Sequence, residues 1–393
     1  VFISHGKDLI LFIEFVFMAK ILIVCNYDFA FNKYMIPFAN KLIDIGHEVG
    51  VACDGDKFDH EKIIGKITYY HLTMPRKISL KGFFLPIFAL RKIIKNNSYD
   101  VVNSNNRNAS FIARIALITL FFSKVKGAYT ARGMYFHDNQ NFIKYYLTYY
   151  VEIFLLFFTH IALSQSEEDV RKLSRNVLVN SSKLNIIHNG ISHEKFSIKN
   201  VKKIDLKIKG LVLCTIGRIV KGKGLNDLVN AFSLFTKTHP NSSLLIIGGP
   251  LHKENNKDLI DLWDTAEQLN IKDKIIITGL VENVEDYLAL ADIYIHPSYR
   301  EGVPRSVLEA MSLGKIVIAT KIRGANEIIN TNKVGILYEK GNIKELVQSI
   351  KYVHNFSFKE KTNMGVMARK RVLELYKEES YVSRQIQFIN KII

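Results

Sequence analysis

The stretch LVLCTIGRIVKGKGLNDLVNAF, residues 211–232, decides the fold class, because it joins a short apolar run to a helical pattern through a glycine turn. Its first part has the continuous apolar character of a strand that is buried on both faces of a sheet. The same order of apolar run, turn and helical pattern recurs in SLLIIGG (243–249), KIIITGL (274–280), DIYIHPS (292–298) and KIVIAT (315–320). Strands that alternate with helices predict an α/β domain of the Rossmann type, with a parallel sheet covered by helices on both faces.

The first half of the chain repeats this alternation. Strands are expected near residues 20–25, 48–53, 68–72, 100–103, 127–131, 160–164 and 184–187. Helices are expected near residues 33–46, 80–96, 108–122, 141–158 and 166–175. We therefore predict an N-terminal Rossmann-like domain over residues 18–192 and a C-terminal one over residues 210–377. Two such doubly wound domains bind their ligands in the cleft at the carboxyl ends of their strands.

Three segments lie outside these two domains. Residues 193–209 are polar and basic without a strong periodic pattern, so they are predicted to be the linker. Residues 378–393 are predicted to form a C-terminal helix that returns to the N-terminal domain. Residues 1–17 form an N-terminal extension whose apolar part, LILFIEFVF, is too short to span a bilayer. We expect that translation starts at Met18 and that the extension lies upstream of the true start.

The bulk composition of the 393 residues indicates a folded protein of more than one domain. Hydrophobic residues make up 48% and charged residues 23%, which is typical of globular proteins and excludes disorder. Cys25, Cys53 and Cys214 each end an apolar run, so they are predicted to be buried free thiols in a reducing, cytoplasmic compartment. The aromatic segment 144–158 is predicted to be a buried helix rather than a membrane anchor.

The formal charge of +17 is concentrated between Met74 and Lys126, where Asp100 is the one acidic residue. The basic residues of this stretch are Arg76, Lys77, Lys81, Arg91, Lys92, Lys95, Arg107, Arg114, Lys124 and Lys126. Interleaved with them are Phe83, Phe84, Phe88, Phe111, Phe121 and Phe122. Such a region fits nucleic acid, an anionic membrane or a phosphorylated acceptor. The alternative is a set of solvated helix faces over a phenylalanine-rich core, which is the commoner arrangement for any single residue.

The loop after the strand at 211–216 has the features of an anion site. Gly217 and Arg218 follow the strand directly, and Lys223 and Gly224 open the next helix. The free amides of a helix N-terminus and its dipole both favour a bound anion, and two cations add to that attraction. The pattern predicts a site for phosphate groups, although a lone motif of this kind is weak evidence.

A second motif, REGVPRSVLE, carries two carboxylates, Glu301 and Glu309, with seven residues between them. One carboxylate can accept hydrogen bonds from sugar hydroxyls and the other can hold a ribose diol. The backbone between them can meet phosphate through Gly302, Val303, Pro304, Arg305, Ser306, Val307 and Leu308. A glycine loop formed by Gly279, Leu280 and Val281, at the end of the strand expected at KIIITGL, can approach a flat base. The alternative for REGVPRSVLE is a surface loop with a capping glutamate.

The order of these motifs resembles the retaining glycosyltransferases of family four, which have the GT-B fold. The resemblance rests on GRIVKGKGLNDLVNAF, on the run from Thr278 to Thr320, and on RGANEII and VGILYEKGN, and it covers most of residues 184–393. In the first half it is looser and rests on MAKILIVC, ANKLIDIGHEVGVACD, YDVVNSNNRNASFIARIAL, YTARGMYFHD and IIHNGIS. It implies two Rossmann-like domains that face each other across a cleft.

The resemblance also implies roles for single residues. Arg218 and Lys223 would neutralise the donor diphosphate, Glu301 would bind the transferred sugar, and Glu309 would bind the ribose, with the Gly279 loop against the base. Such enzymes need neither a metal nor a cofactor, because side-chain cations and a helix dipole stabilise the leaving group.

The N-terminal domain departs from the family pattern. Arg132 occupies a position where family members often carry a histidine, Tyr135 replaces a second one, and His137 lies two residues beyond. Asn26, Tyr27 and Asp28 replace the glycine-rich loop of the family. The acceptor-side candidates are Asn105, Arg132, His137 and Asn189. His188 and His47 are interpreted as structural residues.

The sequence therefore predicts the transfer of a hexose or N-acetylhexosamine, with retention, from a nucleotide diphosphate sugar that is UDP-linked. The predicted acceptor is a lipid-linked or surface polysaccharide at the inner membrane face, with peripheral contact to an anionic membrane. A GT-B sugar-nucleotide epimerase and a glycoside phosphorylase are the enzyme alternatives. A basic nucleic-acid-binding protein is the non-enzyme alternative, against which Glu301 and Glu309 in an anion cleft argue.

Overall fold

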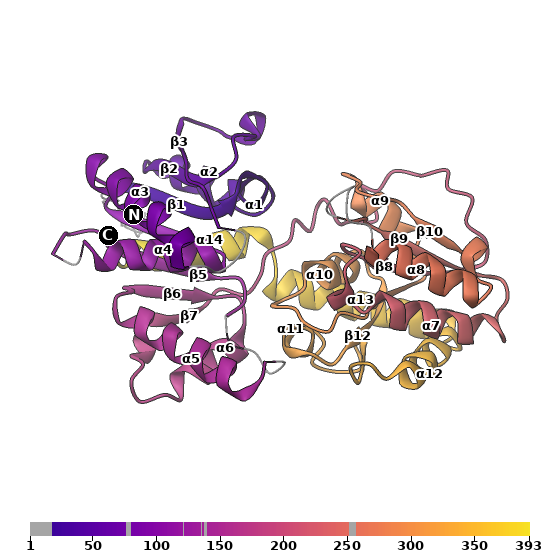
Figure 1. The fold of residues 1–393 in the computed structure, drawn as a ribbon. Helices are drawn as coiled ribbons and strands as arrows, with labels where there is room; N and C mark the ends of the chain where they lie inside the picture. The colour runs from indigo at the N-terminus through magenta and orange to yellow at the C-terminus, as the bar shows by residue number, and fades with distance from the viewer. Residues whose placement is uncertain (1–17, 76–79, 121, 135, 137–139, 251–256) are drawn as a thin grey trace, which may run out of the picture.

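The apolar runs in the first half of the chain form a parallel sheet of seven strands. The computed structural model describes residues 18–75, 80–120, 122–134, 136, 140–250 and 257–393 (Figure 1). The strands are β1 (Lys20–Tyr27), β2 (Glu48–Asp54), β3 (Ile67–His71), β4 (Val101–Asn105), β5 (Lys126–Ala131), β6 (Ile161–Ser164) and β7 (Leu184–Ile186). They lie in the order β3-β2-β1-β4-β5-β6-β7. Residues 1–17, Arg76, Lys77, Phe121, Tyr135 and His137 lie outside the described residues, so the predictions made for them stay predictions.

Helices cover both faces of this sheet. They are α1 (Asp28–Tyr34), α2 (Ile36–Asp44), α3 (Leu80–Asn96), α4 (Arg107–Ile118), α5 (Phe142–Phe157) and α6 (Glu167–Ser174), with short 3₁₀ turns η1 (His60–Lys62) and η2 (Ser181–Lys183). The single helix expected at 33–46 is two helices. The chain leaves helical geometry at Met35, and Pro37 then occupies the first turn of α2, where its missing N–H costs nothing.

The second half forms a parallel sheet of six strands. The strands are β8 (Leu211–Ile216), β9 (Ser242–Ile247), β10 (Ile275–Ile277), β11 (Ile293–His296), β12 (Ile316–Thr320) and β13 (Ile336–Tyr338). The helices are α7 (Leu225–Thr236), α8 (Lys257–Gln268), α9 (Val284–Ala289), α10 (Arg305–Ser312), α11 (Arg323–Ile328), α12 (Ile343–His354) and α13 (Phe358–Leu375), with η3 (Lys221–Lys223) and η4 (Lys272–Lys274). The strand order is β10-β9-β8-β11-β12-β13. The predicted pair of Rossmann-like domains is confirmed.

The strand orders fix where a ligand can bind. In both sheets the order reverses beside the first strand, between β1 and β4 in one domain and between β8 and β11 in the other. The loops that follow these strands diverge to opposite faces of the sheet and leave a crevice at its carboxyl edge. The crevices of the two domains therefore define the site.

The last helix, α14 (Glu378–Asn390), packs on the N-terminal domain (Figure 1). Its Tyr381, Val382 and Ile389 are buried in the cluster that α1 and α2 form with β1 and β2. Because the chain crosses from the second domain back to the first here, α14 adds apolar contact between the two domains.

Helix α5 corrects the expectation of a buried helix. Ile153, Leu155 and Leu156 are buried against the sheet. The opposite face is exposed and apolar, and it consists of Phe142, Ile143, Tyr146, Leu147, Tyr150, Phe154 and Phe157. Within the described residues, no helix combines the length and the apolar character needed to cross a bilayer.

Arg114, one of the cations of the basic stretch, lies in the core rather than on the surface. Its guanidinium contacts the Glu152 carboxylate at 2.5 Å, and both side chains are almost completely buried. The guanidinium carbon also lies 4.1 Å from the centre of the Tyr129 ring. The amphipathic pattern of α4 alone did not show this, because the partner comes from α5.

The three cysteines are free and buried, as expected. Burial raises the pKa of the Cys214 thiol, so this side chain packs as a small apolar group. The cysteines therefore belong to the cores of the sheets.

Candidate functional site

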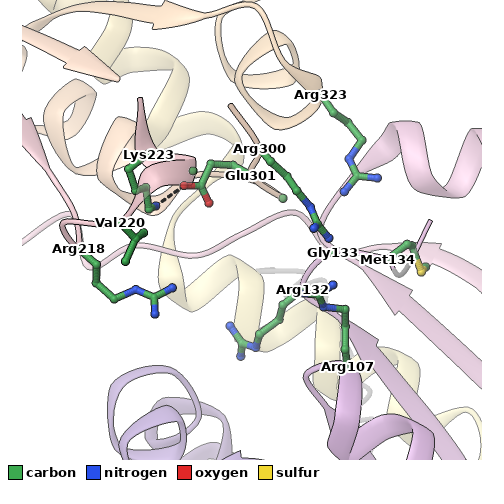
Figure 2. A pocket seen from close by; sticks show the side chains of 12 residues that line it. Arg107, Arg132, Gly133, Met134, Arg218, Val220, Lys223, Arg300, Glu301 and Arg323 are labelled. Atoms are coloured by element: carbon green, nitrogen blue, oxygen red, sulfur yellow. Dashed lines mark hydrogen bonds and ion pairs between the residues drawn. The ribbon is translucent and has the colours of Figure 1, made fainter. Parts of the chain in front are cut away.

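A cavity of about 360 Å³ opens between the two domains (Figure 2). It is lined by Arg107, Arg132, Gly133, Met134, Arg218, Val220, Gly222, Lys223, Arg300, Glu301, Gly302 and Arg323. These residues lie in the loops and helix starts that follow β4, β5, β8, β11 and β12, so each comes from a carboxyl end of a strand. The crevices expected from the strand order therefore meet in one cavity.

The loop between β8 and α7 brings Arg218 and Lys223 into this cavity. Gly224 ends the loop with a φ of +64°, and a side chain there would place its Cβ 2.0 Å from the Pro297 carbonyl oxygen. Only glycine accepts both this conformation and this close approach. The contact holds the loop with Lys223 against the loop after β11, which carries Glu301.

Lys223 and Glu301 form an ion pair across these two loops (Figure 2). The hydroxyl of Ser298 also donates to Glu301, at 3.1 Å. Burial opposes ionisation of Glu301, but the ion pair with Lys223 outweighs it and lowers the carboxyl pKa. The residue predicted to bind diphosphate and the residue predicted to bind the transferred sugar are thus direct neighbours.

His296, the last residue of β11, is buried behind this ion pair. Its Nε2 atom lies 3.9 Å from a Glu301 oxygen. Burial lowers the pKa of His296 to about 4, with Lys223 acting in the same direction and Glu301 opposing. The imidazole is therefore neutral at pH 7, and Glu301 has one close cation rather than two.

This shift makes folding stability depend on pH. Because the folded pKa lies below the ordinary 6.5, the unfolded chain takes up this proton first as the pH falls. The contribution of the neutral His296 side chain to the free energy of unfolding is complete above pH 6.5 and is lost as the pH falls toward 4. We expect wild type to lose about 2 kcal/mol more than His296→Asn between pH 7 and pH 5, measured by urea unfolding. Equal losses in the two proteins would contradict the neutral, buried imidazole.

The cavity holds far more positive than negative charge. Among the described lining residues, five arginines and one lysine stand beside one carboxylate. Sequence reasoning found Arg132, Arg218, Lys223, Glu301 and Gly302 of this lining. It missed Arg107, Arg300 and Arg323 as site residues, because their roles depend on how the two domains dock. Their common signal is a position directly after a strand, which is shared by many surface residues.

Glycines allow the two domains to approach closely at this cavity. A methyl group on Gly302 would lie 2.8 Å from the Arg132 carbonyl oxygen of the other domain. Within the second domain, Gly324 in turn leaves no room for a side chain beside the Gly302 carbonyl oxygen, so the Gly302 loop is held at this place. Backbone therefore packs on backbone where the domains meet.

Polar contacts across the cleft fix this docking. The Glu327 carboxylate of α11 accepts hydrogen bonds from the hydroxyl of Ser166 and from the amides of Glu167 and Glu168. It thus caps α6 of the opposite domain. Arg323 contacts Asp169 of the same helix at 2.5 Å, although burial raises the pKa of Asp169 to about 6. Glu327 and Arg323 therefore join α11 to α6 across the cleft.

Two acceptor-side candidates have structural contacts instead of lining the cavity. The Asn189 side chain donates to the Val303 carbonyl oxygen at 2.9 Å and so links the two domains. Asn105 is buried at the end of β4 and donates to the side chain of Asn103. Arg132 does line the cavity, but its guanidinium donates to the Tyr34 carbonyl oxygen and to the hydroxyl of Tyr381.

Apart from Gly302, the residues predicted for ribose, base and backbone phosphate contacts lie outside the lining. Glu309 is buried in α10, where burial raises its pKa despite the opposing effect of Arg305. Leu280 of the Gly279 loop is exposed, Val303, Val307 and Leu308 are buried, and Arg305 packs over the ring of Tyr34 at 5.2 Å. The roles assigned to Gly217, Gly279–Val281 and the run 303–309 remain predictions.

His47 and His188, the two histidines interpreted as structural, have structural contacts, as expected. The Ala19 amide donates to Nδ1 of His47 at 3.2 Å. His188 packs against the ring of Tyr376, and burial lowers its pKa. Within the described part of the chain, no group of three or more His, Cys, Asp or Glu side chains has a metal-binding arrangement.

Comparison with known proteins matches both halves of the chain to glycosyltransferase families. Residues 197–371 match the family described as glycosyl transferases group 1. Residues 32–195 match the family described as glycosyltransferase family 4. The two matches divide the chain close to the boundary between the two domains.

Relatives cover most of the chain. The capsular polysaccharide biosynthesis glycosyltransferase CapM of Staphylococcus aureus is 27% identical over 77% of this chain and 79% of its own. A UDP-Gal:alpha-D-GlcNAc-diphosphoundecaprenol alpha-1,3-galactosyltransferase of Escherichia coli is 25% identical over 71% and 72%. The structure of Anabaena HepE in complex with UDP and glucose superposes with a TM-score of 0.76, at 16% identity over 94% of this chain and 99% of that one.

Proposed function

Because the chain belongs to the family-four glycosyltransferases with the GT-B fold, we propose that it transfers a hexose or N-acetylhexosamine from a UDP-linked donor, with retention at the anomeric carbon. Glycosyltransferase activity on lipid-linked or polysaccharide glycans follows from the family and the relatives. The single observation that carries the proposed donor site is the cluster of Arg218, Lys223 and Glu301 in the interdomain cavity.

The charges of this cluster suit departure of a diphosphate. In the reaction, the bond between the anomeric carbon and the diphosphate oxygen breaks, and the diphosphate leaves with the electron pair. The acceptor hydroxyl oxygen bonds to the anomeric carbon on the same face, and its proton passes to an oxygen of the departing diphosphate. Negative charge grows on the leaving oxygen, where Arg218 and Lys223 stabilise it. Lys223 exchanges its contact with Glu301 for the phosphate, which leaves Glu301 to accept hydrogen bonds from the sugar hydroxyls.

UDP as the nucleotide is supported by two of the proteins compared above. The name of the Escherichia coli relative includes a UDP sugar and a lipid diphosphate acceptor, and HepE was solved with UDP. The proposed metal independence is supported by the side-chain cations of the cavity, which neutralise a diphosphate without a divalent ion.

Nucleotide release from a panel of nucleotide sugars tests the proposal. We expect UDP release from a UDP-hexose or UDP-N-acetylhexosamine, with the same rate in EDTA as in magnesium. Loss of activity in EDTA that magnesium or manganese restores would contradict metal independence. Product that forms only with added inorganic phosphate would favour a phosphorylase, and interconversion of sugar nucleotides without release would favour an epimerase.

We further propose that the enzyme contacts the membrane through the face formed by α3 and α5. Helices α3, α4 and α5 cover one face of the N-terminal sheet. Phe84, Leu85 and Phe88 of α3 are exposed, as is the apolar face of α5 described above. Exposed aromatics beside basic side chains suit an interface with anionic head groups. Phe83, by contrast, is buried, so the solvated-helix alternative holds for part of the stretch.

Flotation with liposomes tests this contact. The variant Arg91→Glu/Lys92→Glu/Lys95→Glu reverses three charges of α3, and we expect it to lose most of its recovery with anionic vesicles, because each cation contributes about 1 kcal/mol. The matched control reverses three exposed lysines of the other domain, Lys272, Lys321 and Lys370. Equal recovery of the α3 variant and the control on anionic vesicles would show that α3 does not dock. Lys81, which also belongs to the basic stretch, is left unchanged in this variant because its side chain lies outside the described residues.

A further inference from the structure

Arg107, Arg300 and Arg323 lie in a part of the cavity away from Arg218 and Lys223, the two cations proposed to hold the donor diphosphate. Arg107 begins α4 in the N-terminal domain, Arg300 follows β11, and Arg323 begins α11. Figure 2 shows the Arg107 and Arg300 side chains extending toward each other from opposite sides of the cleft, with Arg218 and Lys223 on the far side of Glu301. The cavity therefore has two groups of cations.

Within this second group, the positive charge of Arg300 is not neutralised by a direct contact to any described residue. Burial lowers the pKa of Arg300 to about 10, and repulsion from Arg107 and Arg323 adds to this effect. Asp169 pairs with Arg323, and Glu301 pairs with Lys223. Within the described residues, the Arg300 guanidinium has no hydrogen bond or ion pair. Guanidinium groups held together against their repulsion are typical of a site that binds an anion.

The backbone adds to this attraction. Helix α4 has 12 residues and begins at Arg107, so the positive end of its dipole lies at the cavity wall. The side chain of Asn106, at the N-cap, makes no capping hydrogen bond, and in the first turn the Ala109 amide donates to Oδ1 of Asn26 at 2.9 Å. A helix start and planar guanidinium groups together suit the oxygens of a phosphate, which can accept paired hydrogen bonds.

We propose that Arg107, Arg300 and Arg323 form a second anion subsite that binds a phosphate or diphosphate group of the acceptor. This inference rests on the proposed function, because it takes the other cations to be occupied by the donor. Arg107 comes from the N-terminal domain, which is predicted to bind the acceptor, and Arg300 and Arg323 face it from the second domain. The subsite therefore lies where an acceptor held by the N-terminal domain meets the donor domain. The acceptor is then a sugar attached to a phosphate or diphosphate, with its reactive hydroxyl directed toward Glu301.

Calorimetric titration of the UDP-saturated protein tests the subsite. Inorganic diphosphate and farnesyl diphosphate are the probes, with farnesol as the neutral counterpart. We expect wild type to bind both diphosphates but not farnesol. The variant Arg107→Gln/Arg300→Gln should weaken this binding by about tenfold or more while its affinity for UDP changes little. Both side chains are exposed to the cavity, so folding is expected to survive. The matched control is Arg175→Gln, which changes an exposed arginine at the C-terminal end of α6.

Three outcomes would overturn the inference. One is the absence of diphosphate binding once UDP is bound, and another is equal binding by the double variant and the control. The third is binding of inorganic diphosphate without farnesyl diphosphate, which would assign the subsite to a free anion. If the double variant instead loses as much affinity for UDP as for diphosphate, the arginines belong to the donor site. If UDP fails to bind the wild-type protein, the proposed donor site is wrong. The arginine subsite is then tested by comparing the binding of diphosphate, without UDP, to wild type and to the double variant.

Discussion

The Lys223→Ala variant is expected to lose about 100- to 1,000-fold in kcat/KM, and Arg218→Ala a similar amount. Each change removes a charge that stabilises the departing diphosphate, and that charge grows as the glycosidic bond breaks. The loss should therefore appear mainly in kcat rather than in KM for the donor. Steady-state kinetics with the donor found in the nucleotide panel measure both constants.

Lys221→Ala is the matched control for this prediction. Lys221 lies in the same loop and is exposed, but it does not line the cavity. We expect its kinetics to remain close to wild type. Unchanged turnover in both Arg218→Ala and Lys223→Ala would remove the donor site from this loop. A loss of the same size in Lys221→Ala would show that the loop, rather than the two cations, is what the substitutions disturb.

The second large effect concerns stability. Glu152→Leu is expected to lower the free energy of unfolding of the N-terminal domain by about 3–5 kcal/mol. The substitution leaves the Arg114 guanidinium buried without its carboxylate partner, and a buried unpaired charge is costly. Urea unfolding followed by a probe in this domain measures the change.

The double variant Arg114→Met/Glu152→Leu separates charge from packing. Replacing both partners by apolar side chains of similar size removes the unpaired charge, so most of the lost stability should return. A double variant that is as unstable as Glu152→Leu would mean that packing, and not the buried charge, determines the loss. This outcome would contradict the role assigned to the ion pair.

Much of the fold could be predicted because its signals are local. The apolar runs of the strands and the glycines after them, such as Gly217, identify both sheets and their carboxyl edges. Arg218, Lys223 and Glu301 could be predicted because each lies at such an edge in a specific motif. The break at Met35 within the predicted helix 33–46 shows the limit, since periodicity continues across the interruption.

The rest of the site depends on contacts between distant segments. Arg107 and Arg300 come from different domains, and nothing in their local sequence indicates that they meet. Asn189 was predicted to contact the acceptor because it lies in the motif IIHNGIS, but its side chain donates to the Val303 carbonyl oxygen across the domain boundary. The exposed face of α5 has the same apolar composition as a buried face, so composition alone could not distinguish them.

A crystal structure of the protein with bound UDP would show whether Arg218 and Lys223 hold the donor diphosphate. We expect the diphosphate in the interdomain cavity, within hydrogen-bond distance of Arg218 and Lys223, with the Lys223–Glu301 contact replaced by a contact between Lys223 and phosphate. A nucleotide bound elsewhere, or a diphosphate in this cavity that contacts neither Arg218 nor Lys223, would contradict this assignment.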